Sequence, residues 1–388
     1  MSAPPLKLML CALEPSADAL GADLMASLKE QNPNASFIGC GGSQMQAQGL
    51  ESLFPVERFS VIGPGGALMA LPAALKAIDQ LADLVERKRP DAAVLIDSWS
   101  FSKIAAKKLR RRAPQVKLFK YVAPQVWASR PERAGLTASL FDGVLCLFGF
   151  ETAFFEDAGV RTRWVGHPGF QAARKHQTDK AAFRARHGIG GAPLLAVLPG
   201  SRPAELQRHA APFRGAVEIL TNEFPDLRVV VPAAPGAEAP VRALVADWPG
   251  GAVVVEGAER FDACQAADAA LAASGTATAE LAILGTPMVV AYKVDLVTEV
   301  WARTVLTTRY VSLANIAARD LVAPEFLQRD CRADLLAGAL APLIRGGAER
   351  ERQIEAFPRI AATLAGDRDP GTAAAQALLG WLEAGKSG

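Results

Sequence analysis

The segment Ala269–Tyr292, AALAASGTATAELAILGTPMVVAY, decides the fold class of the chain. It begins with a short apolar run, Ala269–Ala273, which the small residues Ser274–Thr276 interrupt. An Ala/Leu-rich stretch of helical character follows, and Gly285–Pro287 ends it before a second apolar run, Met288–Tyr292. Strand, turn, helix and strand in this order predict a βαβ unit whose turn lies at the carboxyl end of a parallel strand.

The turn Ser274–Thr276 has the chemistry of an anion site. Amides at a helix N-terminus attract negative charge, and Gly275 lets the backbone approach a ligand closely. Thr276 and Glu280 are four residues apart and share one helix face. A carboxylate at that place can accept hydrogen bonds from the two vicinal hydroxyls of a ribose. The segment alone leaves open the alternative that Ser274 or Thr276 caps the helix and Glu280 is solvated.

A second turn of the same kind follows the predicted strand Pro193–Leu198. Gly200 and Ser201 offer backbone donors there and Arg202 offers a guanidinium, which together suit a diphosphate. The turn is not a Walker A loop, because no G-K-[ST] follows it. Two such turns predict a nucleotide diphosphate site in the C-terminal half.

Length and composition limit the class of protein. A chain of 388 residues with 50% hydrophobic residues favours a two-domain α/β protein. A net charge of +2 argues against a nucleic-acid binder. The five cysteines form no C-x-x-C pair, so we expect neither disulfides nor a zinc site. The first residues predict a strand rather than a signal peptide, and no apolar run approaches the roughly 20 residues that span a bilayer, so we expect a soluble or peripheral protein.

The N-terminal half repeats strand, turn and helix. Leu6–Leu13 predicts a strand, Glu14–Asp18 its turn and Ala19–Gln31 a helix. The apolar strand Ala92–Asp97 ends in a carboxylate, at the edge where open α/β sheets bind ligands. Asp97 is therefore a candidate general base; the alternative is that it caps the next helix.

Two further segments each have two interpretations. The apolar stretch Phe59–Leu75 is either a buried loop and helix start, or an exposed patch that touches a membrane or a lipid chain. The basic cluster Lys107–Arg112 is either a solvated helix face or a contact for anionic lipid headgroups.

The remaining segments complete the domain prediction. Residues 171–191 are polar and join the domains, and the chain after Asn315 is expected to be helical to its end. We predict an N-terminal Rossmann-like domain at 1–170, a C-terminal Rossmann-like domain at 171–345 and a helical segment at 346–388.

The chain also resembles the lipid-A-disaccharide synthase family over nearly its whole length. The stretches that carry the resemblance are GCGGSQMQAQGLESLFP, VIGPGGALMALP, LID at Asp97, YVAPQVWASRPERA, VGHP, LPGSRPAEL, ASGTATAELAILGTPMVVAYKV and YVSLANIAARDLVAPEFLQ. Short pieces such as LPGSR are weak signals singly, but this order and spacing are highly specific.

The resemblance implies the GT-B fold: two Rossmann-like domains facing a cleft, with C-terminal helices packing back on the N-terminal domain. It implies an inverting hexosyltransferase that needs no metal or cofactor. Such enzymes join UDP-2,3-diacylglucosamine to 2,3-diacylglucosamine 1-phosphate, giving a β-1,6-linked disaccharide and UDP in lipid A biosynthesis. A cytoplasmic enzyme is implied, held peripherally at the inner membrane through the Val61–Leu75 region and the basic cluster. The family includes homodimers.

The family's functional positions can be carried over singly. The resemblance implies that Asp97 is the general base for the 6-hydroxyl of the acceptor and that Arg202 neutralises charge on the departing UDP. The implied donor site consists of Gly200, Ser201, Arg202, Ser274, Gly275, Thr276, Glu280 and Asn315. The implied acceptor side includes the first-turn residues Glu14, Ser16 and Asp18.

Two departures from the family pattern concern the acceptor side. The first turn, commonly G-E-x-S-G-D, reads LEPSAD at Leu13–Asp18, so both glycines are replaced. The motif I-D-x-P-D-F reads IDSWSF at Ile96–Phe101, which keeps the first Asp and loses the Pro and the second acidic residue. Two alternatives therefore stay open: a UDP-sugar 2-epimerase on the same fold, and a non-catalytic UDP-lipid-binding relative.

Overall fold

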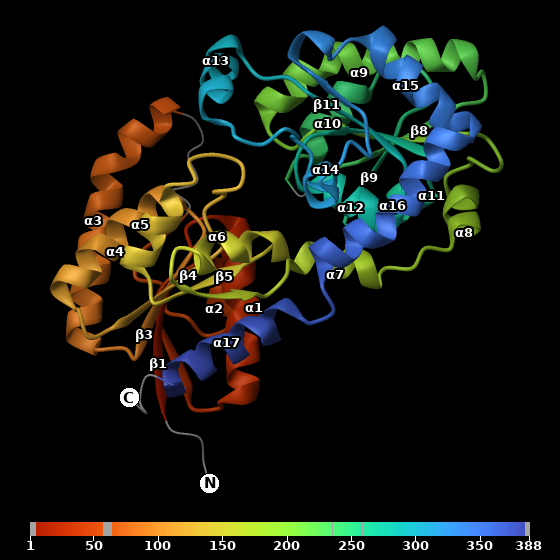
Figure 1. The fold of residues 1–388 in the computed structure, drawn as a ribbon. Helices are drawn as coiled ribbons and strands as arrows, with labels where there is room; N and C mark the ends of the chain where they lie inside the picture. The colour runs from red at the N-terminus through yellow and green to blue at the C-terminus, as the bar shows by residue number, and fades with distance from the viewer. Residues whose placement is uncertain (1–4, 57–63, 235, 258, 385–388) are drawn as a thin grey trace. The chain divides into compact units, whose positions relative to one another are not determined.

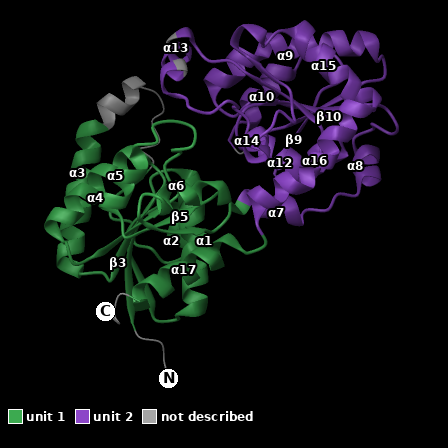
Figure 2. Cartoon of the chain, in the orientation of Figure 1, with its two compact units in different colours: residues 1–168, 367–388 green, residues 169–366 purple. Residues whose placement is uncertain are grey.

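The computed structural model describes residues 5–56, 64–234, 236–257 and 259–384. The chain forms two compact units, one of residues 1–168 with 367–388 and one of residues 169–366 (Figure 2). Each unit contains one six-stranded sheet, and every described strand pair is parallel. The α/β prediction with two Rossmann-like sheets is confirmed.

The first unit, which Figure 1 draws from red to yellow-green with α17 in dark blue, has the strand order β2-β1-β3-β4-β5-β6. Its strands are β1 (Leu6–Cys11), β2 (Ala35–Cys40), β3 (Ala92–Ile96), β4 (Lys117–Tyr121), β5 (Gly143–Cys146) and β6 (Arg161–Trp164). Its helices are α1 (Pro15–Gln31), α2 (Ser43–Ala47), α3 (Pro64–Lys88), α4 (Trp99–Arg112), α5 (Arg133–Leu140), η2 (Gly149–Glu151), α6 (Thr152–Glu156) and α17 (Pro370–Ala384). The central strand β3 is buried on both faces, which is why its sequence is apolar without alternation.

The second unit has the order β12-β11-β10-β7-β8-β9. Its strands are β7 (Leu194–Leu198), β8 (Arg228–Pro232), β9 (Val253–Val255), β10 (Ala269–Ala273), β11 (Met288–Tyr292) and β12 (Glu325–Leu327). Its helices are α8 (Lys180–Arg186), α9 (Pro203–Glu223), α10 (Glu238–Val245), α11 (Glu259–Ala266), α12 (Thr276–Leu284), α13 (Leu296–Val305), α14 (Leu313–Ala318), η3 (Gln328–Asp330), α15 (Ala333–Arg345) and α16 (Ala348–Ala365). Helix α7 (Pro168–Lys175) begins at the boundary between the units.

The two last helices belong to different units. Helix α16 packs on α12 and α14 of the second unit. Helix α17 packs on α1 of the first unit, and its Trp381 stacks on Phe119 of β4 with ring centroids 5.5 Å apart. The segment predicted as residues 346–388 is therefore divided, and α17 is the part that returns to the N-terminal sheet.

Two local expectations were wrong. The first helix begins at Pro15 instead of Ala19, because proline at the first helical position lacks only an amide that has no intrahelical partner. The chain after Asn315 is not helical throughout, because Glu325–Leu327 pairs in parallel with β11 at the sheet edge. Three residues are too few for a recognisable alternating pattern. In the part of the chain that the structure describes, no helix has the length and apolarity that crossing a bilayer requires.

The amino ends of the strands carry a repeated carboxylate contact. An aspartate immediately precedes each of three strands: Asp91 before β3, Asp142 before β5 and Asp268 before β10. Their partners on the neighbouring strands are Lys7, Leu118 and Leu194, respectively. Each aspartate side chain accepts a hydrogen bond from the backbone amide of its partner at 2.8 Å. Each aspartate backbone amide donates to the carbonyl of the same partner at 2.7–2.8 Å. This reciprocal pair extends the strand ladder by one step and fixes the strands at that edge.

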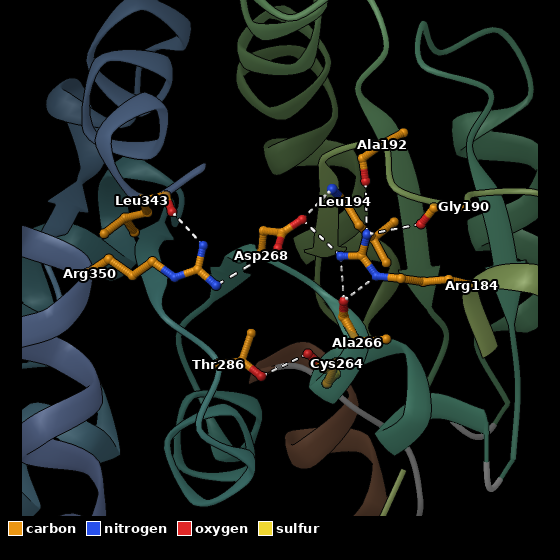
Figure 3. Close-up of polar contacts among 10 residues, drawn as sticks. All are labelled: Arg184, Gly190, Ala192, Leu194, Cys264, Ala266, Asp268, Thr286, Leu343 and Arg350. Carbon is orange, nitrogen blue, oxygen red and sulfur yellow. Dashed lines mark hydrogen bonds and ion pairs between the residues drawn. The ribbon is translucent and has the colours of Figure 1, made fainter. Parts of the chain in front are cut away.

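In the second unit, guanidinium groups strengthen this edge (Figure 3). Arg184 donates to Asp268 at 2.9 Å and to the carbonyls of Ala266 and Ala192 at 2.8 and 2.9 Å. Arg350 lies 3.8 Å from the other Asp268 oxygen. The Asp268 carboxylate and the carbonyls of Ala266 and Ala192 at the amino edge of this sheet are thus paired with side chains of the same unit.

Candidate functional site

The strand orders define one switch point in each sheet. The order reverses between β1 and β3 in the first unit, and between β7 and β10 in the second. Ligands of open α/β sheets bind outside the carboxyl ends of the strands at such points. The residues that follow these strands are the first turn, Asp97, Gly200–Arg202 and Ser274–Thr276.

Asp97 lies in a strained turn directly after β3. Asp97 and Ser98 have φ angles of 52° and 39°, a conformation that costs a non-glycine residue about 1–2 kcal/mol. Ser98 occupies the N-cap of α4 without a side-chain cap bond. Among the described residues the Asp97 carboxylate has no hydrogen-bond partner. The cap alternative is therefore not supported, and the carboxylate is available for a substrate proton.

Lys120, on the neighbouring strand β4, lies beneath this turn. Its side chain is 1% exposed. Its amine donates to the carbonyls of Leu95, Asp97 and Tyr121 at 3.2, 2.5 and 3.1 Å. Burial lowers the pKa of the Lys120 amine to about 7, and the attraction of the Asp97 carboxylate opposes this shift.

The first-turn residues have different environments. Glu14 and Ser16 are exposed, whereas Asp18 is buried. The Asp18 carboxylate accepts the amides of Gly42, Gln44 and Met45 at 2.7, 2.9 and 3.2 Å. The carboxylate thus holds the N-terminal turn of α2, and a place for Asp18 on the acceptor side stays a prediction.

The replaced glycines of this turn have become core positions. Leu13 is 4% and Ala17 is 1% exposed. Leu13 packs in the cluster formed with Met9, Cys11 and Phe54. The departure from the family pattern is accommodated by burial.

The turn Gly200–Arg202 connects β7 to α9. Gly200 has a φ of +113°, and a Cβ atom there would lie 2.7 Å from the Glu205 carboxylate, so the position requires glycine. That carboxylate accepts the amides of Ser201 and Arg202 at 3.1 and 3.3 Å and the hydroxyl of Tyr292 at 3.2 Å. Of the two amides that the sequence assigned to a diphosphate, those of Gly200 and Ser201, the Ser201 amide thus has an internal acceptor, which a diphosphate must displace to reach it. The Arg202 side chain is 62% exposed.

The turn Ser274–Thr276 is more open. Helix α12 begins without a side-chain cap, and both Gly275 and Thr276 are exposed. The Ser274 hydroxyl instead donates to the carbonyl of Val311 at 2.9 Å. The alternative in which Ser274 or Thr276 caps the helix is wrong, and the first amides of α12 remain available to an anion.

Glu280 is not a solvated residue. Its side chain is 14% exposed and pairs with Arg260 of α11 at 3.1 Å. Burial raises the pKa of Glu280, and the Arg260 charge opposes this shift. One face of α12 therefore presents an open N-terminus and, one turn later, an oriented carboxylate.

Asn315 is fully engaged inside the second unit. Its amide nitrogen donates to Ala323 and Glu325, both at 2.8 Å, and its oxygen accepts the amides of Val322 and Ala323, both at 2.9 Å. These four bonds use the two donors and two acceptor sites of the side chain. These contacts order the loop, and the nucleotide contact of Asn315 stays a prediction.

Glu325 completes this support. Its carboxylate accepts the amides of Val311 and Ser312 at 3.0 and 2.9 Å. The Val311 carbonyl in turn accepts the Ser274 hydroxyl. Asn315 and Glu325 therefore support the Ser274–Thr276 turn indirectly, by holding the loop that contains Val311.

His209 links two loops of the site. Its side chain is fully buried; Nδ1 donates to the Pro199 carbonyl at 2.8 Å, and Nε2 accepts the Lys293 amide at 3.1 Å. The Lys293 donor requires an unprotonated Nε2, so the ring is neutral with its proton on Nδ1. Burial lowers the pKa of His209.

Four of these residues were not predicted from the sequence: Lys120, Glu205, His209 and Glu325. Signals for three of them exist. Glu205 and His209 are four apart on the helix that follows the second anion turn and share a face. Lys120 interrupts the apolar strand Val116–Tyr121, and a lysine at a buried strand position needs several acceptors.

The two segments predicted to contact a membrane, the apolar stretch and the basic cluster, differ in how exposed their side chains are. Residues 59–63 of the apolar stretch lie outside the described residues, and the rest forms the start of α3, where Leu71 and Leu75 are 42% and 44% exposed. In the basic cluster, Lys108 pairs with Asp79, and Arg112 pairs with Asp83 and Glu86 of α3. Arg110 pairs with Asp142. The cluster therefore serves largely to join α4 to α3, and its exposed members are Lys107, Arg111 and Arg112, of which Arg112 is paired.

Solved structures resemble the whole chain. Acinetobacter baumannii MurG superposes with a TM-score of 0.57 at 14% identity, covering 98% of this chain and 100% of that one. UDP-GlcNAc 2-epimerase from Neisseria meningitidis bound to UDP-GlcNAc gives a TM-score of 0.56 at 13% identity with the same coverage. With the two sheets, this likeness establishes the GT-B fold; at such identities it supports the epimerase alternative only as a fold neighbour.

Sequence comparison is more specific. The family model described as lipid-A-disaccharide synthetase matches residues 8–366. The lipid-A-disaccharide synthase of Rhodospirillum centenum is 41% identical over 379 residues, covering 97% of this chain and 94% of that protein. The resemblance read from the motifs is confirmed. The chain is a glycosyltransferase that belongs to the lipid-A-disaccharide synthase family.

Proposed function

We propose that this hexosyltransferase joins UDP-2,3-diacylglucosamine to 2,3-diacylglucosamine 1-phosphate and releases UDP. Family membership supports the reaction. The observation that carries the assignment to residues is the Asp97 carboxylate, which lies at the switch point of the first sheet without a hydrogen-bond partner among the described residues.

In this mechanism Asp97 takes the proton of the acceptor 6-hydroxyl as that oxygen attacks the anomeric carbon of the donor. The new bond forms between this oxygen and the anomeric carbon, while the bond from that carbon to the UDP oxygen breaks, with inversion. Negative charge accumulates on the leaving diphosphate. The exposed guanidinium of Arg202 neutralises that charge.

The second unit binds the donor. The open amides at Gly275 and Thr276 contact the diphosphate, and the Glu280 carboxylate, oriented by Arg260, accepts the ribose hydroxyls. Gly200 contributes its amide, and Ser201 contributes its own once the Glu205 carboxylate moves. Supporting this assignment, both turns follow the two strands at the switch point.

The first unit binds the acceptor, with exposed Glu14 and Ser16 at the same sheet edge as Asp97. We propose that Leu71 and Leu75, four residues apart on α3, contact acyl chains or the inner face of the cytoplasmic membrane. Cytoplasmic, peripheral location and a homodimer are part of the same proposal.

The test is UDP release from UDP-2,3-diacylglucosamine with and without the acceptor, for wild type, Asp97→Asn and Asp91→Asn. Asp91 lies at the opposite end of the same strand and serves as the matched control. We expect acceptor-dependent release, a loss of about 10²- to 10⁴-fold in kcat for Asp97→Asn, and wild-type kcat for folded Asp91→Asn.

Other outcomes change the conclusion. Release retained in Asp97→Asn would remove Asp97 as the base. Sugar turnover without acceptor would favour the epimerase, and UDP binding without turnover would favour the non-catalytic alternative.

A further inference from the structure

We propose that Lys120 is a positioning residue whose buried amine holds the Asp97–Ser98 turn in the conformation that presents Asp97 to substrate. This inference rests on the proposed function in one respect, the role of Asp97 as the base.

The turn needs support from outside its own backbone. Two successive non-glycine residues, Asp97 and Ser98, have positive φ. Such strain persists where the surroundings over-determine the conformation, and it gathers at functional sites. Two side chains hold the Asp97 carbonyl: the Lys120 amine donates to it at 2.5 Å, and the Ser102 hydroxyl donates to it at 2.8 Å.

Lys120 can hold the turn because its amine contacts three backbone carbonyls. An ammonium has three donors, and three carbonyls from the ends of β3 and β4 accept them. Because the side chain is 1% exposed, water cannot take over these contacts when the amine is removed.

A role in general stability accounts for Lys120 less well. Without the amine, the Tyr121 carbonyl still accepts the Asp97 amide at 2.9 Å, and the Asp97 carbonyl still accepts Ser102. Both carbonyls therefore keep one donor when the amine is removed. The special property of this amine is its contact with the residue proposed as the base.

The test uses Lys120→Met, with Lys117→Met as the matched control. Lys117 is on the same strand, half exposed, and 3.8 Å from Asp142 at the opposite edge. We expect kcat to fall about 10- to 100-fold in Lys120→Met, as for a catalytic group misplaced by roughly 1 Å. The donor KM and the Kd for UDP should stay unchanged, because the donor residues belong to the second unit. Lys117→Met should retain wild-type kcat.

A double-mutant cycle separates positioning from an independent effect. In the Asp97→Asn background, Lys120→Met should cost no further activity, because Lys120 acts through Asp97. Ser102→Ala should lower kcat in the same direction by a smaller factor. An undiminished loss in the Asp97→Asn background, or a wild-type kcat in Lys120→Met, would overturn the proposal.

Crystal structures of wild type and Lys120→Met give a readout that needs no substrate. We expect the φ angles of Asp97 and Ser98 to leave the left-handed region in the variant. A preserved turn would overturn the inference even if the wild type proved inactive as a synthase, so the two failures are distinguishable. Should Lys120→Met not fold, Lys120→Gln keeps up to two donors, and an intermediate kcat with a preserved turn is expected.

Discussion

The amino and carboxyl edges of the two sheets use acidic side chains for different purposes. At the amino edges, Asp91, Asp142 and Asp268 each accept a strand amide and donate their own amide back. At the carboxyl edges, acidic side chains contact loops: Glu205 holds the second anion turn and Glu325 holds the loop behind α12. Asp97 has no hydrogen-bond partner among the described residues.

The difference follows from geometry. An aspartate one residue before a strand is in register with the first amides of the neighbouring strand, so its partner is supplied by the sheet itself. Beyond the carboxyl ends the strands diverge into loops, and backbone donors at helix N-termini face outward. Charge at the amino edge therefore adds to stability, and charge at the carboxyl edge is available for ligands.

The largest difference between the two edges is expected when an arginine is replaced at each of them, Arg202 at the carboxyl edge and Arg184 at the amino edge. Arg202→Ala should lower kcat by about 10²- to 10³-fold, because charge on the leaving diphosphate loses its counter-charge, and should leave thermal stability unchanged because the side chain is 62% exposed. Arg184→Ala, at the amino edge, should reduce stability and spare kcat. Steady-state kinetics and thermal melts of both variants check this, and the reverse pattern would contradict the division.

The next effect concerns Asp268, which accepts the Leu194 amide and pairs with Arg184. Asp268→Ala should lower the free energy of unfolding by about 2–3 kcal/mol, since a partly buried guanidinium and an amide lose a charged acceptor. Urea denaturation measures it. Asp247→Ala is the control, because the Arg214–Asp247 pair is exposed and should contribute less than about 1 kcal/mol. Equal losses in the two variants would refute a special role for the strand-edge carboxylate.

A smaller effect is expected at two hydroxyls. Ser274 donates to Val311 at the carboxyl edge, and Thr286 donates to Cys264 at the amino edge (Figure 3). Ser274→Ala and Thr286→Val should each reduce the free energy of unfolding by about 1 kcal/mol. Only Ser274→Ala should also weaken UDP binding, as measured by calorimetry. Weaker UDP binding in Thr286→Val would show that the edges are not independent.

The smallest effect is a pH dependence at His209. Burial lowers its pKa in the folded state, below the ordinary value of about 6.5. Between these two pKa values the unfolded chain binds more protons, so the free energy of unfolding decreases as pH falls from about 6.5. His209→Gln should show a shallower decrease over that window when unfolding is followed by urea denaturation at several pH values. Identical slopes for variant and wild type would exclude His209 as a contributor.

Local sequence was sufficient for the βαβ units and for the two turns Gly200–Arg202 and Ser274–Thr276. Glycine at a strand end, followed by a helical stretch, indicates such a turn without further information, as at Gly200 and Gly275. The residue types of Asp18 and Asn315 suggested ligands, yet both are buried, Asp18 with backbone partners and Asn315 with backbone partners and the Glu325 carboxylate. A satisfied polar side chain and an open one have the same letter in the sequence, so only the surrounding contacts distinguish them.

The sequence alone determined the parallel α/β class, the family and the position of Asp97 at a strand end, because each depends on residues close together in the chain or on ordered motifs. The tertiary structure decided which polar groups are still free to bind, because their partners come from distant segments. Lys120 illustrates this point: the strand shows a lysine in an apolar run, and only the pairing of β3 with β4 places its amine on the Asp97 carbonyl.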